Sequence, residues 1–591
     1  MAVKSHMRGG LLNYDEILKH IGQFGIYQIR IHFLLWLVSA ASGLAVVVWA
    51  FTGFNMKYRC PIPHCEKWND TTYYDLSTNT SLPAYAIKGI PNETQKEQRH
   101  CNYYAVDESH FEGSNSGQDL CGQYLGFLDD ANINKTEKQC DLPQLVFDKT
   151  IVESSVMSEY GLACSDHWRR SIVGSTYMLG LLFGSLFFGV ISDRFGRMTS
   201  LMIAVLFVVV SALLSAVIPT VGGFGFFRFI TGMGGMGCFM VTFVLAVEYV
   251  GFKYTMLIGV VIEVPFALGE ILLGIEALYI RDWKTLQLVA YLPWAVLLGL
   301  WFIIPESPRW LIAVGRYEEA ITVVNKAAKV NNRTVPKELL DLTLACEKND
   351  AQKLEPLNED KPSFKDLFMP RSMALRTLNM FYQWFAVTMC YYGLTFASTS
   401  LGGDPHTNYL LGVCIEIPAY IFCILVMDCW GRRPILSFCQ AIAGISCIIA
   451  GLLFDEIEEN KNLIPAQIFF SLVGKFMASA NFAIIYVYTA ELYPTIIRNS
   501  AIGSCSCIAR LGAILALVLQ LLSAYYLPAP MLILGVVALV AGIMALYFPE
   551  TVGNKLPETM EEAIHIGENN SNRGIFTCVC PKSLNELLKE N

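Results

Sequence analysis

Long apolar runs alternate with short polar segments along most of this chain. A run of about 20 apolar residues with few charges is long enough to cross a lipid bilayer as a helix. Several runs are rich in glycine, which lets membrane helices approach one another closely. Twelve runs are predicted as spans, covering residues 32–54, 171–191, 199–219, 224–248, 255–280, 285–304, 373–399, 408–427, 435–454, 463–490, 499–526 and 527–548.

The polar segments between the runs divide the chain into regions. The N-terminal segment has no apolar core of its own, so we do not interpret it as a cleavable signal peptide. The stretch that joins spans 6 and 7 has helical spacing and many charges, which indicates a partly helical region. The predicted division is a segment 1–31, span 1 at 32–54, a large polar insert 55–170, spans 2–6 within 171–304, the joining segment 305–372, spans 7–12 within 373–548 and a tail 549–591.

Composition supports a membrane protein. Hydrophobic residues make up 54% of the chain and charged residues 16%, whereas a soluble domain is about 25% charged. The net charge is −8 and no basic module is present, so we expect no nucleic-acid partner. The chain also lacks histidine-rich metal spacing, a P-loop and a nucleophile elbow, so we expect neither an enzyme nor a metal or organic cofactor.

The distribution of basic residues predicts the orientation. Lys and Arg favour cytoplasmic loops, and with both termini inside the cell the basic segment 305–372 is cytoplasmic. The insert 55–170 then faces outward from the plasma membrane. One segment resists this division, because "RDWK", residues 281–284, falls outside.

The insert has the features of an extracellular domain. Its glycan acceptor sites and its even number of cysteines indicate an oxidising exterior. Six cysteines predict three disulfides, for which fifteen pairings are possible. The four N-x-S/T acceptors are Asn69, Asn79, Asn92 and Asn134, and the cysteines are Cys60, Cys65, Cys101, Cys121, Cys140 and Cys164.

A charged cluster occurs twice, as "ISDRFGRM" (191–198) and as "VMDCWGRRP" (426–434). The two aspartates, Asp193 and Asp428, are 235 residues apart, and other features recur at nearly the same step. The chain therefore reads as a duplicated unit of six spans, which is typical of secondary transporters. We predict an all-α membrane fold of twelve helices in two pseudo-symmetric bundles. The other matched features are Arg228 with Lys475, Glu248 with Glu491, and "PESPRW" at 305 with "PETVGN" at 549.

The repeated clusters lie at the predicted cytoplasmic ends of spans 2 and 8. An aspartate there can accept hydrogen bonds from nearby arginines, and the glycine allows a tight turn. We expect the clusters to form a latch that locks the two halves, with Glu248 and Glu491 at the inner ends of other spans. A plain positively charged loop explains the arginines but not the repeated Asp and Gly. The predicted latch residues are Asp193, Arg194, Arg197, Asp428, Arg432 and Arg433.

These motifs resemble those of a known family. "GVISDRFGRM", "PESPRW", "VMDCWGRRP" and "PET" look like the major facilitator superfamily. The six-cysteine loop after span 1, "RDWKTLQL" and "ELYPTIIRNSAIGSCSCIARLG" are similar to the organic cation, carnitine and organic anion transporter family, most of all its carnitine and organic-cation branch with its insect members. The resemblance covers about residues 12–555. It implies alternating access to one central cavity and movement of small charged organic molecules.

Charged residues inside spans are costly and are therefore paired or functional. Arg510 lies about 16 Å into span 11, near the middle of the bilayer. The resemblance places an acid here in cation carriers and an arginine in anion and carnitine carriers, and a guanidinium can grip a carboxylate with two bonds. Glu263 matches a position that lines the cargo cavity, where an acid can receive an amine. Glu416 and Lys475 match a family acid and base that we expect to neutralise each other.

Aromatic residues are expected to wall the cavity, since ammonium groups bind well to ring faces. Trp384 and Tyr391 are seven residues apart on one helical face and match family positions that contact cargo. The resemblance places Phe239, Phe266, Phe482 and Tyr486 at other lining positions. Met236 and Phe239 stand where the cation carriers of the family have a basic residue and a tryptophan, which argues against simple cation selectivity.

The leading hypothesis is a monomeric, lipid-embedded plasma-membrane carrier of small zwitterionic or cationic amines, such as carnitine or β-alanine. An organic anion exchanger is one alternative, because Arg510 alone would suit it. A receptor or scaffold without transport is another, although a duplicated latch serves movement. A sugar carrier is disfavoured by charge in the cavity. The sequence leaves open whether Na⁺ or H⁺ is the coupling ion.

Overall fold

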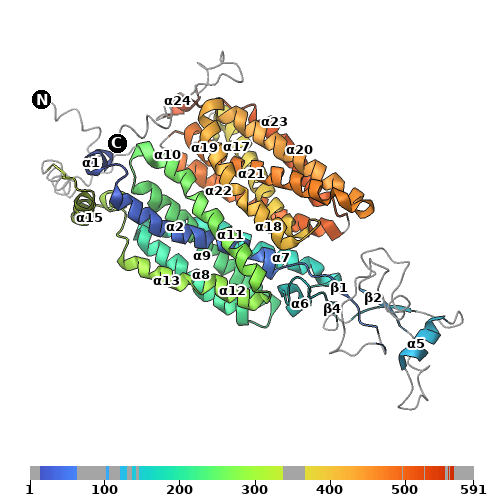
Figure 1. The fold of residues 1–591 in the computed structure, drawn as a ribbon. Helices are drawn as coiled ribbons and strands as arrows, with labels where there is room; N and C mark the ends of the chain where they lie inside the picture. Colours follow the sequence, from blue (N-terminus) through green and yellow to red (C-terminus); the bar gives the residue numbers. More distant parts are fainter. Residues whose placement is uncertain are drawn as a thin grey trace.

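The computed structural model describes residues 14–62, 65, 101–105, 120–129, 136–140, 145–336, 367–369, 371–494, 497–524, 526–552, 557 and 560–564. The long helices form two groups (Figure 1). The first half holds α1 (Tyr14–Ile21), α2 (Ile26–Val47), α3 (Trp49–Thr52), α6 (Val156–Tyr160), α7 (His167–Phe195), α8 (Arg197–Val217), α9 (Val221–Glu248), α10 (Phe252–Val261), α11 (Glu263–Tyr279), α12 (Trp283–Tyr291) and α13 (Trp294–Leu297). The joining segment holds α14 (Pro308–Ala313) and α15 (Tyr317–Val330). The second half holds α17 (Arg371–Ala397), α18 (Pro405–Cys414), α19 (Glu416–Trp430), α20 (Arg432–Glu459), α21 (Ile464–Leu492), α22 (Arg498–Leu519) and α23 (Ala529–Ala545), followed by α24 (Met560–Ile564).

Ten helical stretches of the described residues are long and apolar enough to cross a membrane. The other two predicted spans fall on α17, which has 27 residues, and on α23, an apolar helix of 17 residues. The first long helix begins at Ile26 rather than at residue 32. Polar side chains hid this first part of the helix from the apolar pattern, but His32 is buried between the carbonyl oxygens of Gln28 and Ala246.

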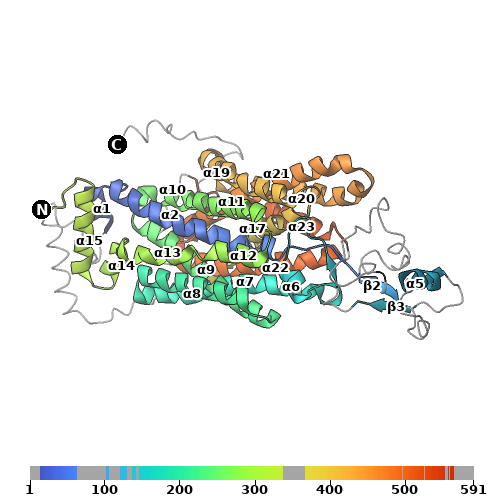
Figure 2. The ribbon, with the colours of Figure 1, turned by 60° about the horizontal axis from the view of Figure 1, so that its bottom comes forward.

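The insert corrects the expectation of an all-α fold. It contains two short antiparallel sheets, one pairing β1 (Tyr58–Arg59) with β4 (Val146–Phe147) and the other pairing β2 (Asn102–Ala105) with β3 (Thr136–Gln139). Helix α5 (Leu120–Asp129) lies near β2 and β3, at the end of the molecule opposite α1 and α15 (Figure 2). Strands of two to four residues are too short to leave a periodic pattern in the sequence.

Disulfides hold the insert together. The structure joins Cys60 to Cys140, Cys65 to Cys121 and Cys101 to Cys164, which selects one of the fifteen possible pairings. The four predicted glycan acceptors lie outside the described residues.

The "RDWK" segment, whose basic residues do not follow the preference of Lys and Arg for cytoplasmic loops, connects this insert to the first half. Arg281 donates to the carbonyl oxygen of Ile151 at 3.1 Å, and Lys284 forms an ion pair with Glu159 at 2.6 Å. Asp282 accepts a hydrogen bond from Ser154 and caps α12 by accepting from the N–H of Thr285. Burial opposes ionisation of Asp282, but the hydrogen bonds from Ser154 and Thr285 hold its pKa below the usual value. These basic residues therefore stabilise an interface rather than set the orientation.

Candidate transport site

A closed cavity lies where the two halves meet. Its volume is about 20 Å³, which is room for about one water molecule. Helices of both halves contribute its wall. The lining residues are Val46 of α2, Leu181 of α7, Gly235, Met236 and Phe239 of α9, Glu263 and Phe266 of α11, Tyr391 and Tyr392 of α17, Tyr420 of α19, Phe482 of α21 and Arg510 of α22.

Arg510 reaches this cavity from α22. The residue is 5% exposed, and its Nη2 atom lies 3.2 Å from the sulfur of Met236 on the opposite half. Its Nε atom has no hydrogen-bond partner, and among the described residues it forms no ion pair. A buried guanidinium that lacks an anionic partner is costly. The arrangement therefore favours a carboxylate arriving from elsewhere.

Glu263 faces the same cavity from α11. It is 5% exposed, and no ion pair or hydrogen bond of its carboxylate occurs within the described part of the chain. Arg510 and Glu416 are the charged groups that act on it. Glu263 and Arg510 line the same cavity, but no ion pair joins them among the described residues. One acid and one base thus line a single cavity without neutralising each other directly.

Two interrupted helices position the acids. The sequences "IEVP" (262–265) and "IEIP" (415–418) share a pattern that sequence reasoning missed. A proline cannot donate a backbone hydrogen bond to the residue four positions earlier, and α10 and α18 end at those positions, Val261 and Cys414. Glu263 and Glu416 begin the next helical segments. Interrupted helices that place polar groups at the midplane are a feature of transporter binding sites.

A second group of charges lies beside the cavity. Glu416 forms a buried ion pair with Lys475 at 2.7 Å and accepts hydrogen bonds from Tyr391 at 2.9 Å and Tyr420 at 3.0 Å. The Lys475 ammonium lies 3.4 Å from the ring centroid of Tyr391 and donates to Thr395 at 2.6 Å. Tyr391 also approaches Glu270 of α11, at 3.4 Å. This group links the two halves through a tyrosine hydroxyl.

Two of the predicted lining residues lie elsewhere. The indole of Trp384 donates a hydrogen bond to Thr489 at 2.9 Å and packs edge-on against Tyr486, with ring centroids 4.5 Å apart. Tyr486 in turn packs against Phe482. Seven residues along a helix keep the same face but change the depth by about 10 Å. Trp384 and Tyr486 therefore form a layer next to the cavity rather than its wall.

Aromatic contacts also join the two halves. Phe51 of α3 stacks on His406 of α18, with centroids 5.2 Å apart, and packs edge-on against Tyr409. Phe243 of α9 faces Tyr486 of α21 at 6.3 Å. These contacts hold the two halves together around the cavity, which at about 20 Å³ is too small for an organic molecule.

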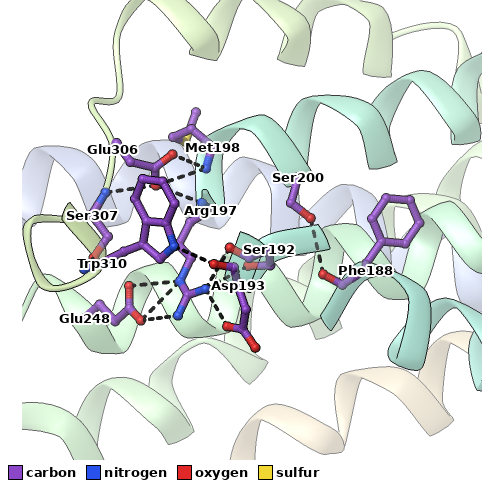
Figure 3. A network of polar contacts seen from close by, with 10 residues as sticks. All are labelled: Phe188, Ser192, Asp193, Arg197, Met198, Ser200, Glu248, Glu306, Ser307 and Trp310. Carbon is purple, nitrogen blue, oxygen red and sulfur yellow. Dashed lines mark hydrogen bonds and ion pairs between the residues drawn. The ribbon is translucent and has the colours of Figure 1, made fainter. Parts of the chain in front are cut away.

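The repeated motif of the first half forms a compact network (Figure 3). Arg197 pairs with Glu248 at 3.0 Å and with Asp193 at 2.7 Å. Glu306 accepts from the backbone N–H groups of Arg197 and Met198 at the start of α8. Burial raises the pKa of Glu306 above its usual value, although these N–H groups and Arg197 oppose the shift. Gly196 has φ +102°, and a Cβ there would meet the Glu306 carboxylate.

The second half repeats this network. Arg432 pairs with Glu491 at 3.0 Å, and Glu550 accepts from the backbone N–H groups of Arg432 and Arg433. Gly431 has φ +97° beside Glu550. The glutamates of "PES" and "PET" thus cap the helices that begin at the duplicated motifs.

The networks correct the predicted latch. The described partners of Arg197 lie in the first half or, for Glu306, in the joining segment directly after it, so its network fastens helices of one bundle and does not reach the second bundle. Arg194 is exposed beside the ring of Phe195 and forms no ion pair among the described residues. The side chain of Asp428 lies outside the described part of the structure. Sequence spacing identified the repeat and the acids Asp193, Glu248 and Glu491, but not the capping glutamates Glu306 and Glu550, which lie more than 100 residues from the arginines.

Comparisons with known proteins identify the family. Residues 121–563 match the family model "Sugar (and other) transporter". The chain is 32% identical over 559 residues to the organic cation transporter protein of Drosophila melanogaster, covering 94% of this chain and 95% of that protein. It is 29% identical over 569 residues to organic cation/carnitine transporter 2 of Mus musculus, with 94% of each chain covered. The chain belongs to the organic cation and carnitine transporter family of the major facilitator superfamily.

This family membership confirms the prediction from the motifs. The proteins of the family that match are transporters rather than enzymes. The xylose transporter XylE from E. coli, in a partially occluded inward open conformation, aligns with a TM-score of 0.52 at 17% identity, covering 66% of this chain and 90% of that chain. This chain therefore shares the fold of that transporter.

Proposed function

We propose that the protein is a plasma-membrane secondary transporter of small organic amines that also carry a carboxylate. Its relatives include organic cation and carnitine transporters. The single observation that carries the proposal is that Glu263 and Arg510 line one closed cavity without pairing to each other. An ammonium group would bind Glu263, and a carboxylate would bind Arg510 with two charge-assisted hydrogen bonds. Carnitine and β-alanine have this arrangement of charge.

The proposed architecture is twelve spans, with α17 and α23 completing the ten long apolar stretches. The insert then faces outward as a glycosylated domain, and α1, α15 and both termini face the cytoplasm. Phe239, Phe266 and Phe482 supply apolar and aromatic surface for the methylene or methyl groups of the cargo. We propose a single chain as the working unit, surrounded by lipid.

Uptake into cells tests this proposal. Cells that express the chain should accumulate more labelled carnitine or β-alanine than control cells do. They should take up a plain quaternary cation or a dicarboxylate less well than these zwitterions. The variant Arg510→Asp should reduce uptake of carboxylate-bearing cargo more than uptake of the plain cation, because it replaces the carboxylate partner by a like charge. Equal losses for both would reject the role of Arg510. Uptake of the dicarboxylate alone would favour an anion exchanger instead.

A further inference from the structure

The charges beside the cavity do not balance. Five buried side chains act on one another there, three acids and two bases, each at most 5% exposed. They leave one net negative charge, which is costly inside a membrane. Arg228 does not belong to this group, since its guanidinium lies 4.4 Å from the ring centroid of Trp49. The five are Glu263, Glu270, Glu416, Lys475 and Arg510.

The imbalance centres on Glu270. This residue is fully buried, and its Oε2 atom has no hydrogen-bond partner. Its Oε1 atom lies 3.4 Å from the hydroxyl of Tyr391, whose other neighbour is Glu416 at 2.9 Å. A tyrosine hydroxyl has one hydrogen, so it can donate to one of the two carboxylates. The shorter distance assigns that hydrogen to Glu416, which leaves the oxygen of Tyr391 facing Glu270 without a proton between them.

A proton on Glu270 completes the chain of donors. The Glu270 hydroxyl would donate to Tyr391, Tyr391 to Glu416, and Lys475 neutralises Glu416 at 2.7 Å. With that proton the five groups sum to zero charge. A zwitterion can then enter a neutral site, with its amine at Glu263 and its carboxylate at Arg510.

The surroundings of Glu270 suit a proton. Helix α2, which packs on the other face of α11, meets it at Ala40 and Gly43, which carry no charge. The described residues include no group of three or more His, Cys, Asp or Glu side chains that could hold a metal ion. The titratable groups that face Glu270 are Tyr391 and Tyr392 of α17, Tyr409 of α18, Glu416 and Tyr420 of α19 and Lys475 of α21, with Glu263 on its own helix.

We propose that Glu270 is a proton-binding site, protonated in the occluded state, and that its proton crosses the membrane together with the cargo. This inference rests on the proposed function for its cargo. Glu270 belongs to the first half, whereas Tyr391, Glu416 and Lys475 belong to the second. Protonation therefore completes a hydrogen-bonded link between the halves, and separation of the halves breaks the link and releases the proton.

Transport by the full chain in liposomes tests the coupling. An inward proton gradient should drive accumulation of labelled β-alanine by the wild type. Glu270→Gln should abolish that accumulation, because glutamine is the neutral mimic of the protonated acid. The same variant should still exchange labelled for unlabelled β-alanine, with a loss below about threefold. Glu276→Gln, a partly exposed glutamate on the same helix, is the matched control and should keep gradient-driven accumulation.

Accumulation that persists in Glu270→Gln, or an equal loss of exchange and accumulation in a folded variant, would overturn the proposal. A second readout needs no cargo. Infrared spectra of the purified protein near pH 7 should show a protonated carboxyl band that disappears in Glu270→Gln and stays in Glu276→Gln. If the wild type moves no cargo, the proposed function fails while this band still decides the protonation. A wild-type spectrum without the Glu270 band would contradict the inference.

Discussion

At the scale of single residues, buried charge decides what this membrane protein can do. Glu416 and Lys475 neutralise each other at 2.7 Å and are 0% and 3% exposed. Glu263 and Arg510 face a cavity without such a partner. The first pair is satisfied within the second half, whereas Glu263 and Arg510 form no ion pair with each other among the described residues. The family resemblance predicted that Glu416 and Lys475 neutralise each other, and the distance between them confirms this pair.

The structural role of the buried pair is testable. Lys475→Met should lower the free energy of unfolding by about 3–5 kcal/mol, because it leaves Glu416 charged and unpaired in the interior. The double variant with Glu416→Gln should recover a large part of this loss. Thermal unfolding in detergent measures both. A double variant as unstable as Lys475→Met alone would show that the pair is not what stabilises this region.

Sequence reasoning identified most residues of the site, but not how far along its helix each one lies. Six of the eight expected substrate residues line the cavity: Arg510, Glu263, Tyr391, Phe266, Phe482 and Phe239. Trp384 and Tyr486 do not, because helical spacing fixes a face but not a depth, and the cavity is short. Tyr392 and Tyr420 were missed, since nothing in the pattern separates a tyrosine that lines a cavity from one that packs in a core.

At the scale of helices and loops, the two interruptions at Glu263 and Glu416 shape the site. Each lies two residues before a proline, Pro265 or Pro418, and separates two helical segments. The repeated "IExP" pattern could have revealed them from the sequence, because proline inside a helix predicts a break. The apolar scan treated each pair of segments as one continuous span.

Replacing Pro265 should make α10 and α11 one continuous helix. Pro265→Ala restores a backbone donor for Val261, so we expect stability to rise by up to about 3 kcal/mol and uptake to fall, because Glu263 would turn with the straightened helix. Pro405→Ala is the control, since Pro405 stands in the first turn of α18 where no backbone bond is missing. Unfolding temperature and initial uptake rate report the two effects. Unchanged uptake in folded Pro265→Ala would contradict a role for the break.

The joint at "RDWK" sets how the insert is held. The pKa of Asp282 is depressed in the folded protein, so the ionised side chain stabilises this joint above about pH 3.9. This contribution disappears as the pH falls through the lower pKa that Asp282 has in the folded state. Asp282→Ala should cost about 1–2 kcal/mol through the lost helix cap and speed proteolysis of the insert at neutral pH. A wild-type rate of cleavage in this variant would show that the joint does not restrain the insert.

At the scale of the whole molecule, the duplicated halves explain both the success and the failure of sequence reasoning. The repeat predicted two bundles. Each half carries the same three features: a glycine turn, an Arg–Glu ion pair and a glutamate that caps a helix. Arg197 takes no part in a latch between the halves, because its partners Glu248 and Glu306 lie in the first half and in the joining segment directly after it. Links between the halves instead include aromatic contacts, the hydroxyls of Tyr391 and Tyr409, and the contact of Arg510 with Met236.

The capping glutamates Glu306 and Glu550 are expected to stabilise the start of α8 and of α20. Glu306→Ala removes the acceptor for two backbone N–H groups at the start of α8 and should lower stability by about 1–2 kcal/mol. Glu319→Ala, an exposed glutamate of α15, is the control and should change little. Thermal unfolding distinguishes them, and equal effects of the two substitutions would contradict the cap.

The central claim is that one acid and one base select a cargo with two opposite charges. Competition for uptake by β-alanine, ethylamine and propionate, in the wild type, Arg510→Gln and Glu263→Gln, tests it most directly. The wild type should prefer β-alanine to both single-charge analogues. In Arg510→Gln the preference for β-alanine over ethylamine should fall at least about tenfold, which corresponds to about 1.4 kcal/mol. In Glu263→Gln the preference for β-alanine over propionate should fall by a similar factor. The same loss of affinity for all three compounds in either variant would contradict the claim.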